Sequence, residues 1–515
     1  MKLSATKLLR PAPNSPGRAP AAEGPSRRVR SPRMDAARSR PEGPTQVPAA
    51  AGAEPAPAAV AAPVTEDGPL PALPPTAAEI LRFAVPLMLG LMTTAINAFV
   101  DTLFVGRLGT APLAAVPLAA LTYMTGWVLV VGLMRNAIAF CARAYGAGRP
   151  AEIGGIVAHY HVLALAALPL LLLYVQAWPM LARFALLDAQ TDGLGRIYLE
   201  IRVWDVAFSL LIALYSAFYQ ATGNSRFPML VSATVVGLNI VLDYALIFGH
   251  FGLPALGVAG SALATVLAQA AGTALIMGAS HLGPARRRYG LRLFVPLRRA
   301  LLRDILRVGL PSGVGDFLEV GAWVVFQLIV GRLGAVALAA SNIGMMATHL
   351  LFLPGFAFGI AGASYIGRYL GAGRPDLARH AGRRVLLLGV GYMALLGVPL
   401  WFFGEAIAAL FTADARVIHE AGLLFKVMAL YQAFDGMGFI TRAALGGAGD
   451  TRVPLGVLLV CSLCVLFPGA WLLSQLVSPP LIGAWLGACA YMVAYAAAMQ
   501  WRFHSGAWTR IRLAE

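Results

Sequence analysis

The pentapeptide VGRLG occurs at residues 105–109 and again, 225 residues later, at 330–334. GAGRP at 146–150 repeats with the same offset at 371–375, and no gap is needed between the two matches. With an offset of 226, the glycine and the proline of GNSRFP at 223–228 fall on those of GDTRVP at 449–454. A repeat that covers most of the chain predicts two halves of similar structure.

Long apolar runs surround these motifs. The 515 residues are 58% hydrophobic and 12% charged, with a mean hydropathy of +0.71, whereas soluble domains are about 45–50% apolar. Runs of about 18 residues or more can cross a hydrocarbon layer of about 30 Å as helices. The composition therefore excludes a water-soluble two-domain protein. We predict twelve membrane helices, near residues 80–106, 112–144, 155–178, 196–221, 228–249, 256–280, 305–331, 337–369, 382–404, 420–442, 454–476 and 481–503.

The predicted fold is an all-α polytopic membrane protein with two six-helix repeats. Because each repeat has an even number of helices, both enter the membrane in the same direction. A pseudo-two-fold axis along the membrane normal then relates them and leaves a central cavity between two lobes. The expected boundaries are a tail at 1–78, a first lobe at 79–283, a basic linker at 284–304, a second lobe at 305–503 and a short C-terminal tail at 504–515.

The formal net charge of +16 indicates topology rather than nucleic-acid binding, because the arginines lie in short connectors and in the N-terminal tail. The positive-inside rule places the linker and both termini in the cytoplasm, and we expect the protein in the cytoplasmic (inner) membrane. The Ala-, Pro- and Arg-rich tail is predicted to be disordered. An organelle transit peptide, or a true start at Met34, are the alternatives for this tail.

Acidic residues inside the first lobe mark a candidate ion site, since a carboxylate at the bilayer centre costs about 2.5–3.5 kcal/mol. Asp101 and Asp243 lie five and six residues before the outer ends of their helices, at a depth of about 7–9 Å. Equal depth allows them to share one site. Asn97 and Asn239 stand one turn away, where an amide can donate to a carboxylate or coordinate an ion.

The second lobe carries its own acids. Glu319 and Asp435 are both predicted in the middle third of the membrane, and Asp316 stands one turn from Glu319. We expect them to bind a cation or the substrate. For every acid named here the alternative is a structural role, in which it pairs with a polar neighbour across helices.

Arg135 lies in the second predicted helix, about 16 Å from its inner end, too deep to reach the inner surface easily. The predicted charge partner is Asp101 or Asp243, whose carboxyl group it would keep ionised. Capping of helix carbonyl groups, or exposure to a wet vestibule, is the alternative.

The chain resembles the multidrug and toxic compound extrusion (MATE) transporters of the multidrug/oligosaccharidyl-lipid/polysaccharide flippase superfamily. The resemblance covers about residues 79–503 and rests on the order and spacing of seven motifs: VDTLFVGRLG (100–109), GAGRP (twice), LNIVLDYALIFG (238–249), GVAGSALAT (257–265), FLEVG (317–321), YQAFD (431–435) and GAGDTRVP (447–454). It implies a V-shaped bundle that exports organic cations in exchange for H⁺ or Na⁺.

Positions that match the family motifs imply specific roles. Asp101, Asn239 and Asp243 correspond to the coupling site of the proton-coupled branch. Glu319 and Asp435 correspond to acids that bind Na⁺ in the sodium-coupled branch, which leaves the coupling ion undecided. Apart from such an ion, neither a metal nor a cofactor is implied.

The expected function is therefore secondary active efflux of small cationic or amphipathic compounds by a monomer that works by alternating access. No nucleic-acid partner and no enzymatic activity are expected. The first alternative is a flippase for a lipid-linked saccharide, which needs a more basic cavity than these acids suggest. The second is an intramembrane enzyme, but the sequence shows no facing His/Asp or His/His constellation.

Overall fold

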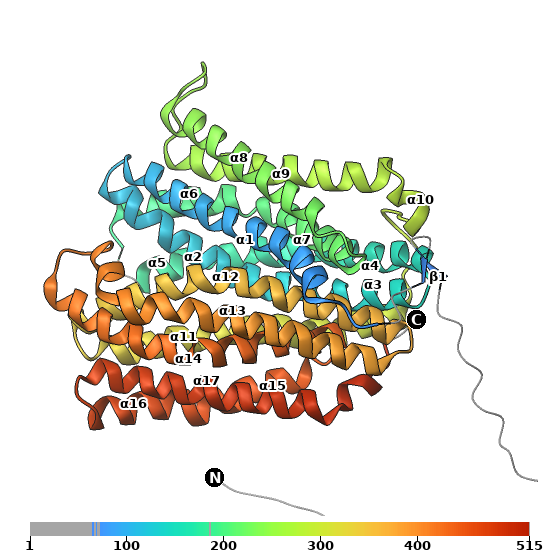
Figure 1. Ribbon diagram of the computed structural model, residues 1–515. Helices are drawn as coiled ribbons and strands as arrows, with labels where there is room; N and C mark the ends of the chain where they lie inside the picture. The colour runs from blue at the N-terminus through green and yellow to red at the C-terminus, as the bar shows by residue number, and fades with distance from the viewer. Residues whose placement is uncertain (1–63, 66–67, 70–72, 185–186, 514–515) are drawn as a thin grey trace, which may run out of the picture. The chain divides into compact units, whose positions relative to one another are not determined.

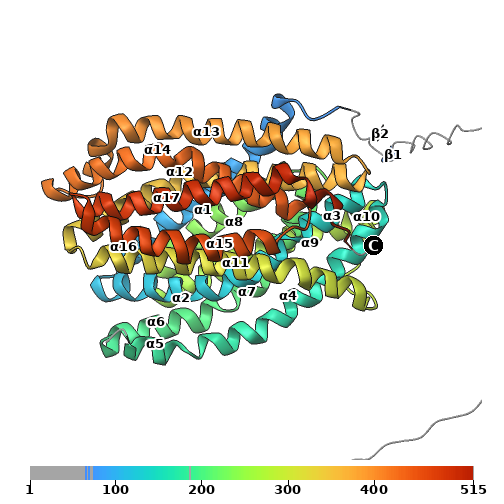
Figure 2. The ribbon, with the colours of Figure 1, turned by 90° about the horizontal axis from the view of Figure 1, so that it is seen from below.

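The computed structural model describes residues 64–65, 68–69, 73–184 and 187–513. Long α-helices run side by side through this part of the chain (Figures 1 and 2). Eleven of its helical segments are long and apolar enough to cross a membrane. The predicted all-α membrane fold of about twelve helices is confirmed.

The helices of the first half lie close to their predicted positions: α1 (Ala77–Gly106), α2 (Thr110–Arg135), α3 (Ala137–Gly146), η1 (Pro150–Glu152), α4 (Ile153–Val175), α5 (Trp178–Phe184), α6 (Ala189–Arg202), α7 (Asp205–Ala221), α8 (Arg226–Phe248) and α9 (Val258–Leu282). The linker contains α10 (Ala285–Tyr289). The second half contains α11 (Arg299–Gly331), α12 (Ala335–Gly371), α13 (Pro375–Ala409), α14 (Ala415–Gly447), α15 (Arg452–Cys461), the π-helical turn η2 (Ser462–Leu466), α16 (Phe467–Leu476), α17 (Pro480–Ser505) and η3 (Ala507–Arg510).

The predicted helix at 196–221 is broken into α6 and α7. Of the two, only α7 is apolar, and it is shorter than the eleven helical segments that are long enough to cross a membrane. The helix α6 packs on the same neighbours as α7, namely α2 and α9. It begins after Asp188, whose carboxylate accepts from the backbone N–H groups of Gln190 and Thr191. The hydrogen bond from the Thr191 hydroxyl and these backbone bonds hold the pKa of Asp188 below its usual value. Together α6 and α7 occupy the place of the fourth predicted helix.

Contacts between the two halves gather at one end of the bundle, the end that carries GAGRP and the basic linker. There α3 packs on α12 so closely that a Cβ on Gly146 would meet the carbonyl oxygen of Arg368, and one on Gly371 would meet that of Arg143. The Arg368 guanidinium also donates to the carbonyl oxygen of Gln220 across the halves (3.3 Å). In Figure 1 this end lies to the right, near α3, α10 and the C-terminus.

The first helix belongs to the cores of both halves. It packs on α8, and its N-terminal part, including Ile80 and Phe83, shares a buried cluster with Ala357 and Phe358 of α12. The start of the helix is fixed by Thr76, which forms a reciprocal capping box with Glu79. The N-terminal part of α1 thus packs against helices of the second half.

Most of the predicted disordered tail, residues 1–78, lies outside the described residues. Its described part includes two short antiparallel strands, β1 (Val64–Thr65) and β2 (Gly68–Pro69). The segment before α1 is held by hydrogen bonds, from Tyr369 to the carbonyl oxygen of Leu73 (3.0 Å) and from Arg384 to that of Pro75 (3.0 Å). The segment that leads into α1 is thus attached to α12 and α13.

Candidate functional site

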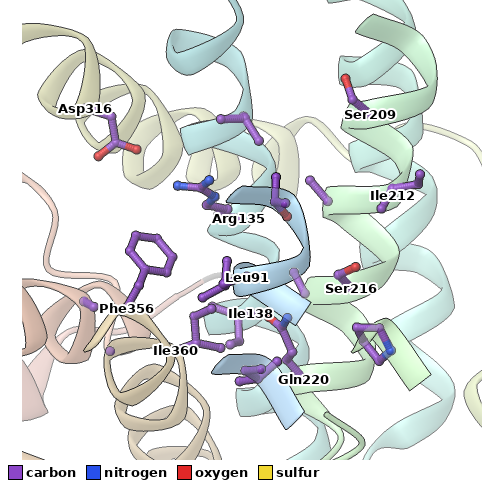
Figure 3. A pocket seen from close by; sticks show the side chains of 18 of the residues that line it. Leu91, Arg135, Ile138, Ser209, Ile212, Ser216, Gln220, Asp316, Phe356 and Ile360 are labelled. Atoms are coloured by element: carbon purple, nitrogen blue, oxygen red, sulfur yellow. The ribbon is translucent and has the colours of Figure 1, made fainter. Parts of the chain in front are cut away.

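A cavity of about 510 Å³ lies between the two halves, a volume typical of sites for drug-sized ligands. It is lined by α1, α2, α3, α6, α7, α8 and α9 of the first half and by α11, α12, α14 and α15 of the second. Figure 3 shows part of its wall, with Arg135 between Asp316 and Phe356 on one side and Ser216 and Gln220 of α7 on the other.

Asp101 and Asp243 come together between α1 and α8, as their predicted depth suggests. The carboxyl groups are close enough to interact, and the Asn97 side chain donates to Asp101 (3.1 Å). Asp101, Asn97 and Asn239 line the cavity, whereas Asp243 lies behind them and is fully buried. The four residues predicted for this site thus form one cluster, which we call the first-half acid cluster.

Six buried polar atoms of the first-half acid cluster have no hydrogen-bond partner in the described structure. They are Oδ1 of Asn97 and Asp101, both amide atoms of Asn239, and both carboxylate oxygens of Asp243. Buried polar atoms are nearly always hydrogen-bonded, so such a concentration needs an occupant. Five of the six are oxygens, the donor type that binds a proton, a sodium ion or water.

A second ionic group lies beside this cluster. Arg202 forms an ion pair with buried Asp205 (2.9 Å), and Tyr123 donates to the same carboxylate oxygen (2.6 Å) while the guanidinium lies over its ring. Asp205 is therefore neutralised and has a structural role. Arg202 also interacts electrostatically with Asp101 and lines the cavity.

In the second half, Asp316 and Glu319 are bound by an arginine that the sequence analysis missed. Arg442 of α14 donates one amino group to Asp316 and the other to Glu319. The ion-paired side chains are only partly exposed, 15% for Arg442 and 18% for Asp316. The predicted proximity of the two acids is thus observed, but each carboxylate already has a cationic partner.

Asp435 stands two helical turns before Arg442 on α14 and interacts electrostatically with Glu319. No ion pair joins it to any cation in the part of the chain that the structure describes. Buried Tyr431, one turn earlier, is stacked on Trp485 (ring centroids 6.2 Å apart). Glu319 and Asp435 are therefore neighbours, but only Glu319 has a cationic partner among the described residues, namely Arg442.

Arg135 points into the cavity, but it does not reach the acids predicted as its partners. Among the described residues its guanidinium lies over the Phe356 ring (5.0 Å) and interacts electrostatically with Asp316 and Arg442 of the second half. The pairing with Asp101 or Asp243 is not present. The reason is helix rotation: α2 packs its Gly132 face against Gly313 of α11, which turns the next residues toward the second half.

Comparison with known proteins decides the family. The MatE family model matches residues 86–245 and 311–472, one match in each half and more than half of the chain. The chain belongs to the MATE family. The two matches begin 225 residues apart, at 86 and 311, which is the offset of the sequence repeat.

Curated MATE relatives cover most of the chain. It is 32% identical over 440 residues to a probable multidrug resistance protein NorM of Pseudomonas aeruginosa, a match that spans 82% of this chain and 89% of the relative. It is 27% identical over 435 residues to a probable NorM of Thermotoga maritima, spanning 84% and 93%.

Solved MATE-type structures share the fold. An outward-facing multidrug resistance MATE transporter superposes with a TM-score of 0.77 at 22% identity and covers 84% of this chain and 96% of its own. A superfamily transporter from Pyrococcus furiosus, described as having a binding pocket of reversed polarity, superposes with a TM-score of 0.76 at 23% identity, covering 84% and 96%.

Two of the arginines in this MATE cavity were not singled out from the sequence. Arg442 lies in an apolar stretch, where an arginine requires an acidic partner, so the rule that identified Arg135 would also have identified Arg442. Arg202 lies in α6, which also contains Asp192, Arg196 and Glu200 and is not apolar, so that rule does not identify it. Which acid each one binds depends on how the helices pack, and the sequence does not show this.

Proposed function

We propose that this protein exports small cationic or amphipathic compounds across the cytoplasmic membrane in exchange for protons. It acts as a monomer without a cofactor, with both termini in the cytoplasm. Alternating access to the central cavity couples the two movements. Sodium is the alternative coupling ion, since the same oxygen-rich cluster can bind it.

The observation that carries the proposal is the first-half acid cluster with its six unpartnered buried atoms. Two carboxyl groups in contact cannot both remain ionised without cost, so one shared proton stabilises the pair. Asp101 lines the cavity while Asp243 lies behind it. A bound organic cation and a bound proton would therefore compete for the same negative charge.

The contacts between the halves support the proposed cycle. They lie at the end with the basic linker, which the positive-inside rule places in the cytoplasm. In this arrangement the cytoplasmic end of the cavity is closed by packed glycines. Alternating access requires the α3–α12 contact to separate while a corresponding contact forms at the other end.

Purified protein in liposomes tests the proposal. With the membrane potential clamped by potassium and valinomycin, we expect an imposed pH gradient to drive ethidium across the membrane in the direction opposite to the proton flow. An equal Na⁺ gradient at uniform pH should have no effect. Ethidium movement driven by the Na⁺ gradient alone would identify sodium, rather than the proton, as the coupling ion. Failure of both gradients would contradict the transport proposal.

The orientation has a separate test. In a variant whose native cysteines are replaced, Arg288→Cys and Arg379→Cys should be protected from an impermeant thiol reagent added to intact cells. Asp414→Cys should react, because the residue lies in the exposed loop before α14 at the opposite end. Labelling at position 288 would reverse the topology.

The flippase remains a second candidate because the cavity is more basic than the sequence suggested. Three arginines line it, Arg135, Arg202 and Arg442, and they equal its three aspartates in number. Two of these arginines are ion-paired to acids, which favours drug export. Transfer of a fluorescent polyprenyl diphosphate between leaflets, without ethidium transport, would favour the flippase.

A further inference from the structure

The arginine at the end of α6 interacts with two different acids. Arg202 is the last residue of α6 and Asp205 is the first residue of α7, so the break between the two helices separates them. Arg202 pairs with Asp205 (2.9 Å) and also interacts electrostatically with Asp101. Arg202 and Asp101 both line the central cavity, whereas the Asp205 side chain is only 2% exposed. One guanidinium group thus interacts with a carboxylate of the first-half acid cluster and with a carboxylate outside it.

The ion pair between Arg202 and Asp205 uses only part of the carboxylate. Arg202 and Tyr123 both donate to Oδ2 of Asp205, whereas its Oδ1 is buried and has no hydrogen-bond partner in the described structure. A guanidinium group binds a carboxylate most strongly through two parallel hydrogen bonds, one to each oxygen. That arrangement is absent here. Arg202 can therefore leave Asp205 at a lower cost than a two-bonded arginine, and Tyr123 still donates to Asp205 when it does.

The charge of the first-half acid cluster has one cation to balance it. Within the described residues, the titratable and charged groups that interact with Asp101 are Asp243 of α8 and Arg202 and Tyr198 of α6. Arg202 is the cation among them, and it interacts with Asp243 as well. When the shared proton leaves the cluster, both carboxyl groups are ionised and attract Arg202 more strongly. The attraction of Arg202 to Asp205 does not change at this step.

We propose that Arg202 is a movable counter-ion of the coupling site. It pairs with Asp205 while the first-half acid cluster holds a proton, and it turns toward Asp101 when the proton leaves. The inference rests on the proton exchange proposed above. Arg202 is a positioning residue, because its guanidinium group keeps its own proton and acts through Asp101. It stabilises the deprotonated cluster until an organic cation displaces it, and so it sets the pH at which proton and substrate exchange.

The pH dependence of ethidium binding tests this role without transport. Ethidium fluorescence measures binding to detergent-purified full-length protein over a range of pH. Protons compete with the dye, so the midpoint pH reports ionisation of the cluster. Arg202→Gln should raise the midpoint by about one pH unit, since a nearby cation favours the ionised carboxylate. Asp205→Asn should lower the midpoint, because Arg202 is then free to pair with Asp101.

Three further variants control for folding and for charge. Arg202→Gln leaves buried Asp205 without a cation, whereas Arg202→Gln/Asp205→Asn leaves no unpaired charge and should also raise the midpoint. Arg202→Lys keeps the charge and should restore a midpoint close to that of the wild type. Arg196→Gln removes the same charge from an exposed pair with Glu200 on the same helix and should leave the midpoint unchanged.

The single and double variants at Asp205 decide the outcome, because they differ only at Arg202. An unchanged midpoint in Asp205→Asn, or a shift of both variants in the same direction, would overturn the inference. A structural role alone would lower the yield of folded protein and leave the midpoint unchanged. Binding by the wild type that does not depend on pH would contradict the proposed proton exchange, and this inference with it. Dependence on pH in the wild type with unshifted variants would contradict the inference alone.

Discussion

The two halves have equivalent helices, but their charged residues lie at different positions. In the first half, Asp101 and Asp243 face each other with buried oxygens that have no partner in the described structure. In the second half, Arg442 binds both Asp316 and Glu319. The carboxylates of the first half therefore have no cationic side chain bound to them directly, whereas Asp316 and Glu319 in the second half share the guanidinium of Arg442.

The repeat explains how this difference arose without changing the fold. With the offsets of the repeat, Asp101 corresponds to Phe326 and Asp243 to Gly469, whereas Glu319 corresponds to Thr94 and Arg442 to Ser216. None of the charges recurs at its equivalent position. What recurs are the turns and the glycine contacts, so packing is common to both halves and the chemistry is specific to each.

The largest expected effect is at the first-half acid cluster. Asp243→Asn should abolish transport of ethidium driven by a pH gradient, because an amide cannot exchange the proton. Asp101→Asn should do the same, while expression and thermal stability remain near wild type. Glu405→Gln, which changes an exposed carboxylate far from the cavity, is the control and should transport normally. Normal transport by Asp243→Asn would show that proton coupling does not depend on the first-half acid cluster.

The next effect concerns stability. Arg442→Met should lower the free energy of unfolding by about 2–4 kcal/mol, since it leaves two partly buried carboxylates without a cation. Thermal denaturation in detergent measures the loss. The triple variant Arg442→Met/Asp316→Asn/Glu319→Gln should recover most of it, because no unpaired charge remains. An unstable triple variant would show that packing, rather than charge, explains the loss.

A smaller effect is expected at Asp435, an acid of the second half for which no cationic partner is found among the described residues. Asp435→Asn should raise the KM for ethidium about tenfold, the equivalent of one lost charged contact of about 1.4 kcal/mol, and should leave coupling to protons intact. If Asp435→Asn lost proton coupling while Asp243→Asn retained it, proton coupling would depend on the second half rather than the first.

The smallest effect is expected for Arg135→Met. Because Arg135 contacts Phe356 rather than the first-half acids, the pH profile of transport should not change. Affinity for ethidium should rise about two- to threefold as a positive charge leaves the cavity. A shifted pH profile that disappears when Asp101 and Asp243 are also neutralised would restore the original pairing hypothesis.

Hydropathy was sufficient to locate most of the helices, although not the break between α6 and α7, and the rise per residue was sufficient to bring Asp101 and Asp243 together. The sequence did not determine which way a helix turns about its axis. The rotation of α2 depends on Gly132 meeting Gly313, a contact between residues far apart in the chain, and it directs Arg135 toward Asp316. For the same reason the partners of Arg202 and Arg442 required the structure.

The contact between α3 and α12 is reciprocal. Residues 143 and 146 are related by the repeat to 368 and 371, and each glycine abuts the carbonyl oxygen of the arginine in the other half. This is the form of an isologous interface, in which one surface patch meets a copy of itself. Two identical six-helix chains, inserted in the same direction, would meet through the same patch. The contact between α3 and α12 thus has, within a single chain, the geometry of the interface of a two-fold symmetric homodimer.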